Sequence, residues 1–222
     1  MLRNTQLTAG IGLKSRAILL VRSGRRSEHV VELIHQAAQI RALKDQLTHL
    51  TGETSSFAIN QGKEFLYMAT VPGLQPLRAY VEPGARIPLS MPTASGRAIL
   101  AFSPPEVIDE LLSKNLQKFT PKTIVDPAKL RIVLEDIKRC GVSVVHGENQ
   151  QQLSAVAAPI MDSVGRCIGS LAMSGVTQGR FEGEALEKII QLAKSQAEKI
   201  NELIRNTNQR VGASEKRVKA TK

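Results

Sequence analysis

The chain has 222 residues, of which 42% are hydrophobic and 23% are charged, so it is long enough to bury a hydrophobic core in one or two domains. This composition excludes a disordered tail and a disulfide-stapled miniprotein. Aromatic residues make up only 3% of the chain and Trp is absent, which argues against an aromatic platform for single-stranded nucleic acid.

The formal net charge of +10 is concentrated at the two ends of the chain. Residues 1–27 carry six basic and no acidic residues, and residues 205–222 carry six basic residues and one acidic residue. Residues 28–204 hold 18 basic and 19 acidic residues and are close to neutral. The basic ends would suit phosphate or an acidic lipid surface, but solubilising tails have the same composition and are more common.

Cys140 and Cys167 fit a reduced, cytoplasmic protein in which both act as small apolar side chains. The apolar run Ala17–Val21 is far shorter than the roughly 20 residues that span a bilayer, so no membrane contact is expected. The four histidines are His29, His35, His49 and His146. None has the paired spacing or the neighbouring ligands that zinc needs, and neither a metal nor another cofactor is expected.

The first predicted element is an amphipathic helix over residues 28–50, because apolar residues recur there at steps of three and four without Gly or Pro. Gly52 is expected to end it. The runs Ser56–Asn60 and Glu64–Val71 then predict a β-hairpin. A third run, Leu77–Val81, lies between prolines and predicts a short strand near the edge of a sheet.

Three helices are predicted in the middle of the chain. They cover residues 93–101, residues 104–115 and a segment that begins after Asp126, the expected N-cap, and ends at Cys140-Gly141. Three strands follow, over Val142–Val145, Ser154–Ile160 and Cys167–Ser174.

Small residues gather in the last two of these strands, namely Ala157, Ala158, Gly169 and Ala172, with Gly175 just beyond. They would either let a helix approach closely or leave room for a ligand, and close helix packing is the more common reason.

The chain closes with a second long amphipathic helix over Glu182–Ile204, followed by a polar tail expected to be disordered. The apolar faces of the two terminal helices each need a partner. We therefore expect these helices to pair on one face of an antiparallel sheet of about six strands, with the inserted helices on the other face or at the ends. This arrangement is of the α+β class.

The residues offer little evidence of catalysis. The turn Thr93–Arg97 lacks the glycine spacing of a nucleotide-binding loop, and it is either a plain helix cap or an anion site at a helix N-terminus. No nucleophile elbow is present. Cys140 and Cys167 each follow an arginine, which is weak evidence for an activated thiol, and His146 is either a solvated residue at a strand end or a pocket residue.

Eight short segments, taken in order, resemble the effector-binding domain of IclR-type bacterial transcription regulators. They are Thr51–Thr54, Pro76–Arg78, Gly84–Leu89, Thr93–Ala101, Phe119–Ile124 with Asp126-Pro127, Arg139–Val144, Val156–Ile160 and Leu171–Gly175. Each is weak alone, but their order makes the resemblance specific over roughly residues 28–205.

The resemblance implies a GAF-like domain over residues 28–205 that senses a small metabolite, such as an organic acid or an aromatic compound, and that assembles as a homodimer or homotetramer. It implies no enzymatic activity. In relatives a winged helix-turn-helix precedes this domain and reads DNA. Only 27 residues precede it here, and we interpret them as a linker remnant with a short helix over Leu13–Val21, so DNA binding by this chain alone is not expected.

The resemblance also implies effector contacts at eight residues: Thr93, Ala94, Ser95, Val145, His146, Ala155, Ala172 and Ser174. The family often has an acidic residue in place of Val145 and a Cys in place of Ala155, so this pocket should be more apolar. The hydroxyls of Thr93, Ser95 and Ser174 would bind the ligand, with a charge contact from His146.

Two other hypotheses stay open at this point. The chain could be a stand-alone dimerisation partner that pairs with a full-length regulator and does not bind DNA itself. It could also be a redox enzyme that uses Cys140 or Cys167, which the sequence favours least.

Overall fold

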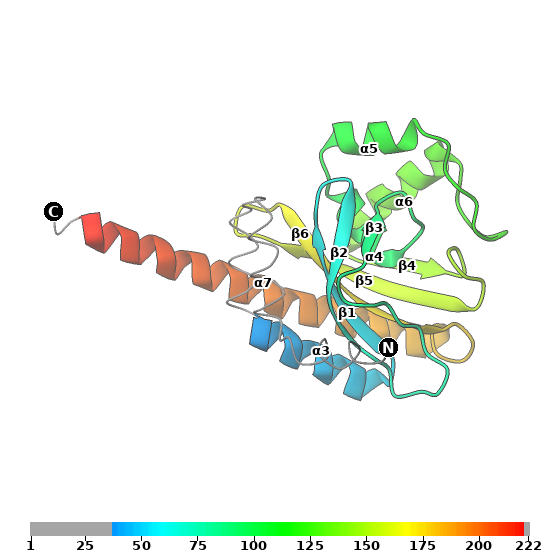
Figure 1. Ribbon diagram of the computed structural model, residues 1–222, viewed down its shortest axis with the longest axis horizontal. Helices are drawn as coiled ribbons and strands as arrows, with labels where there is room; N and C mark the ends of the chain where they lie inside the picture. Colours follow the sequence, from blue (N-terminus) through cyan, green and yellow to red (C-terminus); the bar gives the residue numbers. More distant parts are fainter. Residues whose placement is uncertain (1–36, 220–222) are drawn as a thin grey trace, which may run out of the picture.

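The computed structural model describes the backbone of residues 37–219 and the side chains of residues 40–206. The expected linker helix over Leu13–Val21 and the predicted start of the first helix at residue 28 lie outside these residues. Within them, a six-stranded antiparallel sheet is sandwiched between two groups of helices (Figure 1).

The sheet has the strand order β3-β2-β1-β6-β5-β4. Its strands are β1 (Thr54–Asn60), β2 (Glu64–Val71), β3 (Arg86–Pro88), β4 (Ser143–His146), β5 (Leu153–Met161) and β6 (Cys167–Val176). β1 pairs with both β2 and the distant β6, which brings the first and last strands of the domain together in the middle of the sheet. The predicted hairpin and the adjacent pair of closing strands are confirmed.

The helices α3 (Ala37–Thr51) and α7 (Gly183–Lys219) lie together on one face of the sheet (Figure 1). Ile40 and Leu47 of α3 and Ile200 of α7 pack there against a layer of large strand side chains, among them Phe57 and Leu171. The predicted pairing of the terminal helices on one face is therefore confirmed, as is the α+β class.

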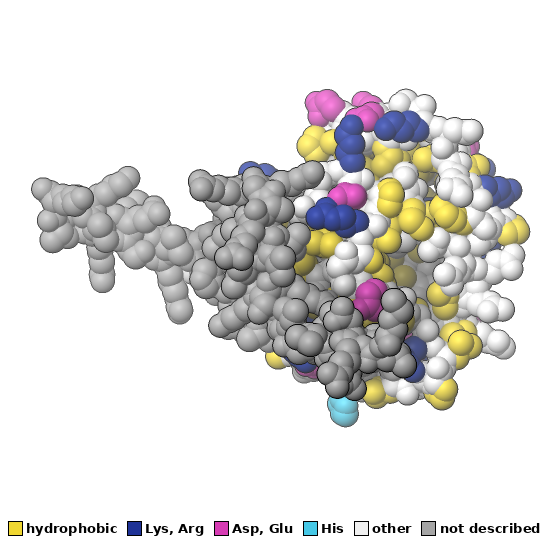
Figure 2. Space-filling view, in the orientation of Figure 1, with side chains coloured by type: hydrophobic (Ala, Val, Ile, Leu, Met, Phe, Trp, Pro, Cys, Tyr) yellow, Lys and Arg dark blue, Asp and Glu magenta, His cyan; other side chains and the backbone are white. Residues whose placement is uncertain are grey.

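Three shorter helices cover the opposite face: α4 (Ala94–Ala101), α5 (Pro105–Leu112) and α6 (Pro127–Cys140). α4 lies directly on β5 and β6, where Ala94 and Ala98 meet Ala157 and Ala172. α5 is farther from the sheet, and its outer surface is solvated. Over it, basic side chains lie beside acidic ones (Figure 2), and the ion pairs Lys63–Glu110 and Arg131–Asp109 are both 2.7 Å long.

Local sequence explains where these helices begin and end. The Thr93 side chain accepts a hydrogen bond from the amide of Gly96 and caps α4, and Asp126 caps α6 by accepting from the amides of Ala128 and Lys129. Gly141 ends α6 with a positive φ of 70°, a left-handed conformation that glycine adopts without steric cost. The predicted boundaries at Asp126 and Gly141 are confirmed.

The prediction of a strand over Leu77–Val81 is wrong. Residues 72–85 run without regular structure, and the carbonyl of Ala79 accepts a hydrogen bond from the Thr54 hydroxyl at 2.5 Å instead of joining a ladder. The edge strand is β3, which pairs with the start of β2. Pro88 lacks an N–H group, and an edge position tolerates this because only one side of the strand is paired.

The C-terminal helix also differs from the expectation. The backbone of α7 continues to Lys219, past residue 206, where a disordered tail was expected, and it extends beyond the rest of the domain (Figure 1). The segment contains no proline, and once a helix is nucleated each further residue adds a hydrogen bond at little cost.

Candidate functional site

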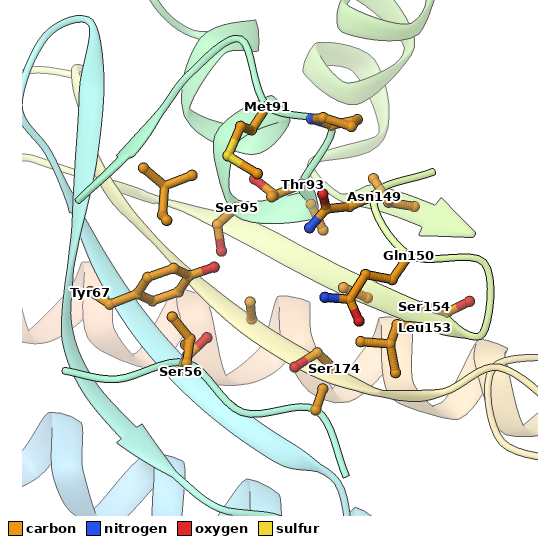
Figure 3. A pocket seen from close by; sticks show the side chains of 18 of the residues that line it. Ser56, Tyr67, Met91, Thr93, Ser95, Asn149, Gln150, Leu153, Ser154 and Ser174 are labelled. Atoms are coloured by element: carbon orange, nitrogen blue, oxygen red, sulfur yellow. The ribbon is translucent and has the colours of Figure 1, made fainter. Parts of the chain in front are cut away.

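A cavity of about 200 Å³ lies on the α4 face of the sheet. The first turn of α4, side chains from the six strands, the irregular segment at residues 79–81 and the loop between β4 and β5 enclose it (Figure 3). For comparison, a cavity of about 150 Å³ is known to hold a benzene molecule. The space therefore suits a small organic molecule.

The walls combine an apolar lining with uncharged polar groups. The hydroxyl-bearing residues are Ser56, Tyr67, Tyr80, Thr93, Ser95, Ser154 and Ser174, and the carboxamides are Asn149 and Gln150. The apolar lining comes from Ala79, Val81, Ile87, Met91, Pro92, Ala94, Val145, Leu153, Ala155 and Ala172. An apolar pocket with a few placed hydrogen-bonding groups is the usual form of a small-molecule site.

Tyr67 and Ser95 form the polar end beside α4. The Tyr67 ring stacks edge-on against Phe65, with 5.2 Å between the ring centres, and its hydroxyl is hydrogen-bonded to the Ser95 side chain. Burial raises the pKa of the Tyr67 phenol above its usual value, and the bond to Ser95 only partly offsets this. The phenol is therefore neutral and can both donate and accept a hydrogen bond.

Seven of the eight residues to which the resemblance assigned effector contacts line the cavity: Thr93, Ala94, Ser95, Val145, Ala155, Ala172 and Ser174. Their role in binding stays a prediction. The eighth, His146, is not part of the lining. Successive side chains of a strand point to opposite faces, so His146 lies on the other side of β4 from Val145. There its Nδ1 is 3.0 Å from the Ser154 hydroxyl.

Six polar residues of the cavity were not predicted from the sequence: Ser56, Tyr67, Tyr80, Asn149, Gln150 and Ser154. Alternation along β1 and β2 would have placed Ser56 and Tyr67 on one face of the hairpin, had it been known which face the cavity occupies. Nothing local marks Asn149 or Gln150, because they lie in a loop whose path is set by contacts distant in sequence.

The small residues of β5 and β6 have separate roles. Ala157 lies under α4, and Ala172 both contacts α4 and lines the cavity. Both reasons given for small side chains, close helix packing and space for a ligand, therefore apply to Ala172. The glycines have a different role, because neighbouring atoms leave no room for a side chain there. A β-carbon on Gly169 would lie 2.2 Å from the Ala58 carbonyl oxygen, and one on Gly175 would collide with the Glu53 carboxylate.

The cysteines give no support to redox chemistry. Cys167 is buried, and burial raises the pKa of its thiol to about 12, so the reactive thiolate is absent at neutral pH. Cys140 is exposed at the end of α6, away from the cavity lining.

In the described part of the chain, no group of three or more His, Cys, Asp or Glu side chains could hold a metal ion. None of the helices described here has the length and apolar character needed to cross a bilayer.

The curled antiparallel sheet, with paired terminal helices on one face and a cavity under α4 on the other, defines a GAF-like α+β domain. The family model described as "Bacterial transcriptional regulator IclR C-terminal" matches residues 28–202. The chain therefore belongs to the IclR family, with this C-terminal domain, and the resemblance found in the sequence is confirmed.

Relatives agree with this assignment. The chain is 30% identical to the HTH-type transcriptional repressor AllR of Klebsiella pneumoniae over 75% of its length, and 31% identical to the HTH-type transcriptional regulator BhcR of Paracoccus denitrificans over 62%. It spans 58% and 49% of those two proteins.

Solved structures share the fold. The Thermotoga maritima IclR superposes with a TM-score of 0.73 at 29% identity, covering 87% of this chain and 74% of that one. An IclR homologue from Microbacterium hydrocarbonoxydans, solved in complex with 4-hydroxybenzoate, superposes with a TM-score of 0.67 at 24% identity, covering 76% of this chain and 69% of that one.

Proposed function

We propose that this chain senses a small organic molecule in the cavity beneath α4 and works as the effector-binding part of a cytoplasmic transcription regulator. The observation that carries the proposal is the cavity itself, about 200 Å³ in volume and lined by uncharged hydrogen-bonding groups on an apolar wall. The effector class is a small organic acid or aromatic compound, in keeping with the 4-hydroxybenzoate bound by the Microbacterium homologue.

In this proposal the ligand acts by shifting a population of arrangements. Copies of the chain assemble as a homodimer or homotetramer, and the ligand stabilises the arrangement in which the cavity fits it better. α4 is well placed to transmit such a change, since its first turn lines the cavity and its body packs on β5 and β6. DNA is contacted through a helix-turn-helix domain of the regulator and not through the GAF-like domain.

The test is ligand binding by the full chain. Thermal unfolding is measured with a panel of small organic acids and aromatic compounds, with 4-hydroxybenzoate as the first probe. A ligand at about 100 times its Kd stabilises a protein by about 2.7 kcal/mol, which raises the Tm of a chain of this size by about 5–10 °C.

The matched variants are Ala155→Leu, which fills the cavity, and Ala128→Leu, which adds the same atoms on the exposed surface of α6. The ligand-dependent rise in Tm should disappear in the first and persist in the second. The proposal is wrong if no compound in the panel raises the Tm, or if Ala155→Leu responds to the ligand as the unmodified chain does.

A further inference from the structure

The polar groups of the cavity lie at two ends. Tyr67 and Ser95 lie at the α4 end, and the carboxamides of Asn149 and Gln150 lie on the loop between β4 and β5 (Figure 3). Val145 and Leu153 belong to the apolar wall of the same cavity. None of the described side chains that line the cavity carries a formal charge. A ligand that fills it therefore meets only uncharged groups at the loop end, among them the carboxamides of Asn149 and Gln150.

Two charged residues adjoin the lining segments, but each neutralises the other. Arg97 lies two residues after Ser95 on α4, and Glu148 directly precedes Asn149 in the loop. The Arg97 guanidinium donates to both carboxylate oxygens of Glu148, at 2.6 and 2.5 Å. The two side chains are 4% and 9% exposed, so the pair is almost completely removed from solvent. Neither charge is available to a ligand in the cavity.

The same ion pair connects the two ends of the cavity. Through it, α4 holds the loop whose next two residues are Asn149 and Gln150. The backbone of the loop is held as well, because the hydroxyls of Thr120 and Thr123 donate to the carbonyls of Gly147 and Glu148 at 2.7 and 2.6 Å. The amide of Ile124 donates to the Glu148 carboxylate at 3.2 Å, which leaves this glutamate anchored from three directions.

We propose that Asn149 and Gln150 determine specificity at the loop end of the cavity by binding an uncharged group of the ligand that donates and accepts hydrogen bonds, and that the buried Arg97–Glu148 pair positions them. This inference rests on the proposed function, since it assigns the ligand class of the same cavity. Hydroxyl and carboxamide groups meet the requirement. A carboxylate at this end would lose its hydration without gaining a counter-ion, which disfavours its binding.

The α4 end differs from the loop end. The first N–H groups of a helix have no intrahelical acceptor, and those of Ala94 and Ser95 belong to the turn that lines the cavity. An acceptor oxygen of the ligand, including that of a carboxylate, is bound there by these groups and by the Tyr67 hydroxyl. The ligand class is therefore a small molecule with an oxygen acceptor at one end and an uncharged hydroxyl or amide at the other.

Hydrogen exchange of the full chain tests the positioning role without any ligand. In Arg97→Met, amides of residues 147–153 should exchange at least about tenfold faster than in the unmodified chain, while those of α7 keep their protection. Arg97→Lys should restore part of that protection, since it keeps the charge. Arg131→Met, which removes an exposed ion pair with Asp109, is the matched control and should leave the loop unchanged.

If Arg97→Met does not fold, Glu148→Gln replaces it, because this change keeps the size of the side chain and removes one charge of the pair. Unchanged exchange of residues 147–153 in a folded variant of either kind would overturn the positioning role.

The ligand class is tested with 4-hydroxybenzoate and terephthalate, two probes of similar shape that differ in the charge of one end. We expect the unmodified chain to bind 4-hydroxybenzoate at least about tenfold more tightly. Gln150→Lys, which supplies a cation at the loop end, should reduce or reverse this preference.

Equal affinity for the two probes, a preference that Gln150→Lys leaves unchanged, or binding of neither probe would each overturn the assigned ligand class. These outcomes are distinguishable from failure of the proposed function, which requires that the whole panel of organic acids and aromatic compounds leaves the Tm unchanged.

Discussion

The two faces of the sheet are built from different side chains. On the α3 and α7 face, Phe57, Leu171 and Met173 are at most 2% exposed and pack against two long helices. On the α4 face, the neighbouring positions of the same strands hold Ser56 and Ala172. One face fills its space with large apolar groups, and the other keeps a cavity of about 200 Å³.

The difference separates the face that stabilises the fold from the face that holds the proposed ligand cavity. Burying large apolar side chains supplies most of the free energy of folding, and the α3 and α7 face does this with a continuous cluster. The α4 face can then keep small and polar side chains next to open space, since the other face of each strand is already fixed. Variants on the α3 and α7 face should therefore change mainly the free energy of unfolding, and variants on the α4 face should change mainly ligand binding.

The largest expected effect comes from Phe57→Ala, on the stabilising face. Removal of a buried Phe costs about 3–5 kcal/mol, because the lost transfer energy is added to the cost of the cavity left behind. Urea unfolding should show a lower midpoint with an unchanged slope. The matched variant Ser56→Ala, next in the chain but on the cavity face, should cost less than about 1 kcal/mol. Similar losses in the two variants would contradict the division between the faces.

A buried charge weakens the stabilising face. Lys44 on α3 is 1% exposed, and burial lowers the pKa of its amine to about 8, an effect that Asp45 only partly opposes. The unfolded chain holds this proton up to a pH of about 10.4, so between pH 8 and 10.4 it binds more protons than the folded chain. Lys44 should therefore contribute a rise in the free energy of unfolding with pH in this range, and it should destabilise the fold most below pH 8. The buried Cys167 thiol, whose pKa is raised to about 12, contributes the opposite slope above about pH 8.5.

Lys44→Met removes the charge and keeps the apolar stem. The free energy of unfolding at pH 7 should exceed that of the unmodified chain by on the order of 3 kcal/mol, and this gain should shrink between about pH 8 and pH 9.5. Urea unfolding at a series of pH values measures both. Arg41→Met, at an exposed position of the same helix, is the control and should show no comparable gain at pH 7. A gain in Lys44→Met that stays constant between about pH 8 and pH 9.5 would contradict the lowered pKa of Lys44.

The smallest expected effect is at the helix cap beside the cavity. Thr93→Ala removes the acceptor for the Gly96 amide and should cost about 1 kcal/mol, whereas Thr93→Ser keeps an acceptor and should cost little. Asp126→Ala removes the cap of α6 at a similar cost. Only Thr93→Ala should also weaken ligand binding, because Thr93 lines the cavity. Equal ligand-induced rises in Tm for the two alanine variants would show that Thr93 is a cap alone.

Much of the fold follows from local patterns. Helical periodicity and the end signals at Asp126 and Gly141 located the helices, and the apolar runs located five of the six strands. The strand predicted over Leu77–Val81 does not form, because an apolar composition does not guarantee a neighbouring strand with which the segment can pair. The Thr54 hydroxyl donates a hydrogen bond to the carbonyl of Ala79, and Arg86–Pro88 forms the edge strand of the sheet.

By itself, then, the sequence determined most of the elements, their class and the family, because period, caps and ordered motifs are encoded in neighbouring residues. It also pointed to the first turn of α4 and to the small residues of β5 and β6. Only the tertiary structure decided which faces and loops meet. Strand register turned His146 away from the cavity, and a buried ion pair between Arg97 and Glu148, 51 positions apart in the chain, set Asn149 and Gln150 beside it. Such contacts depend on chain packing, which no local pattern records.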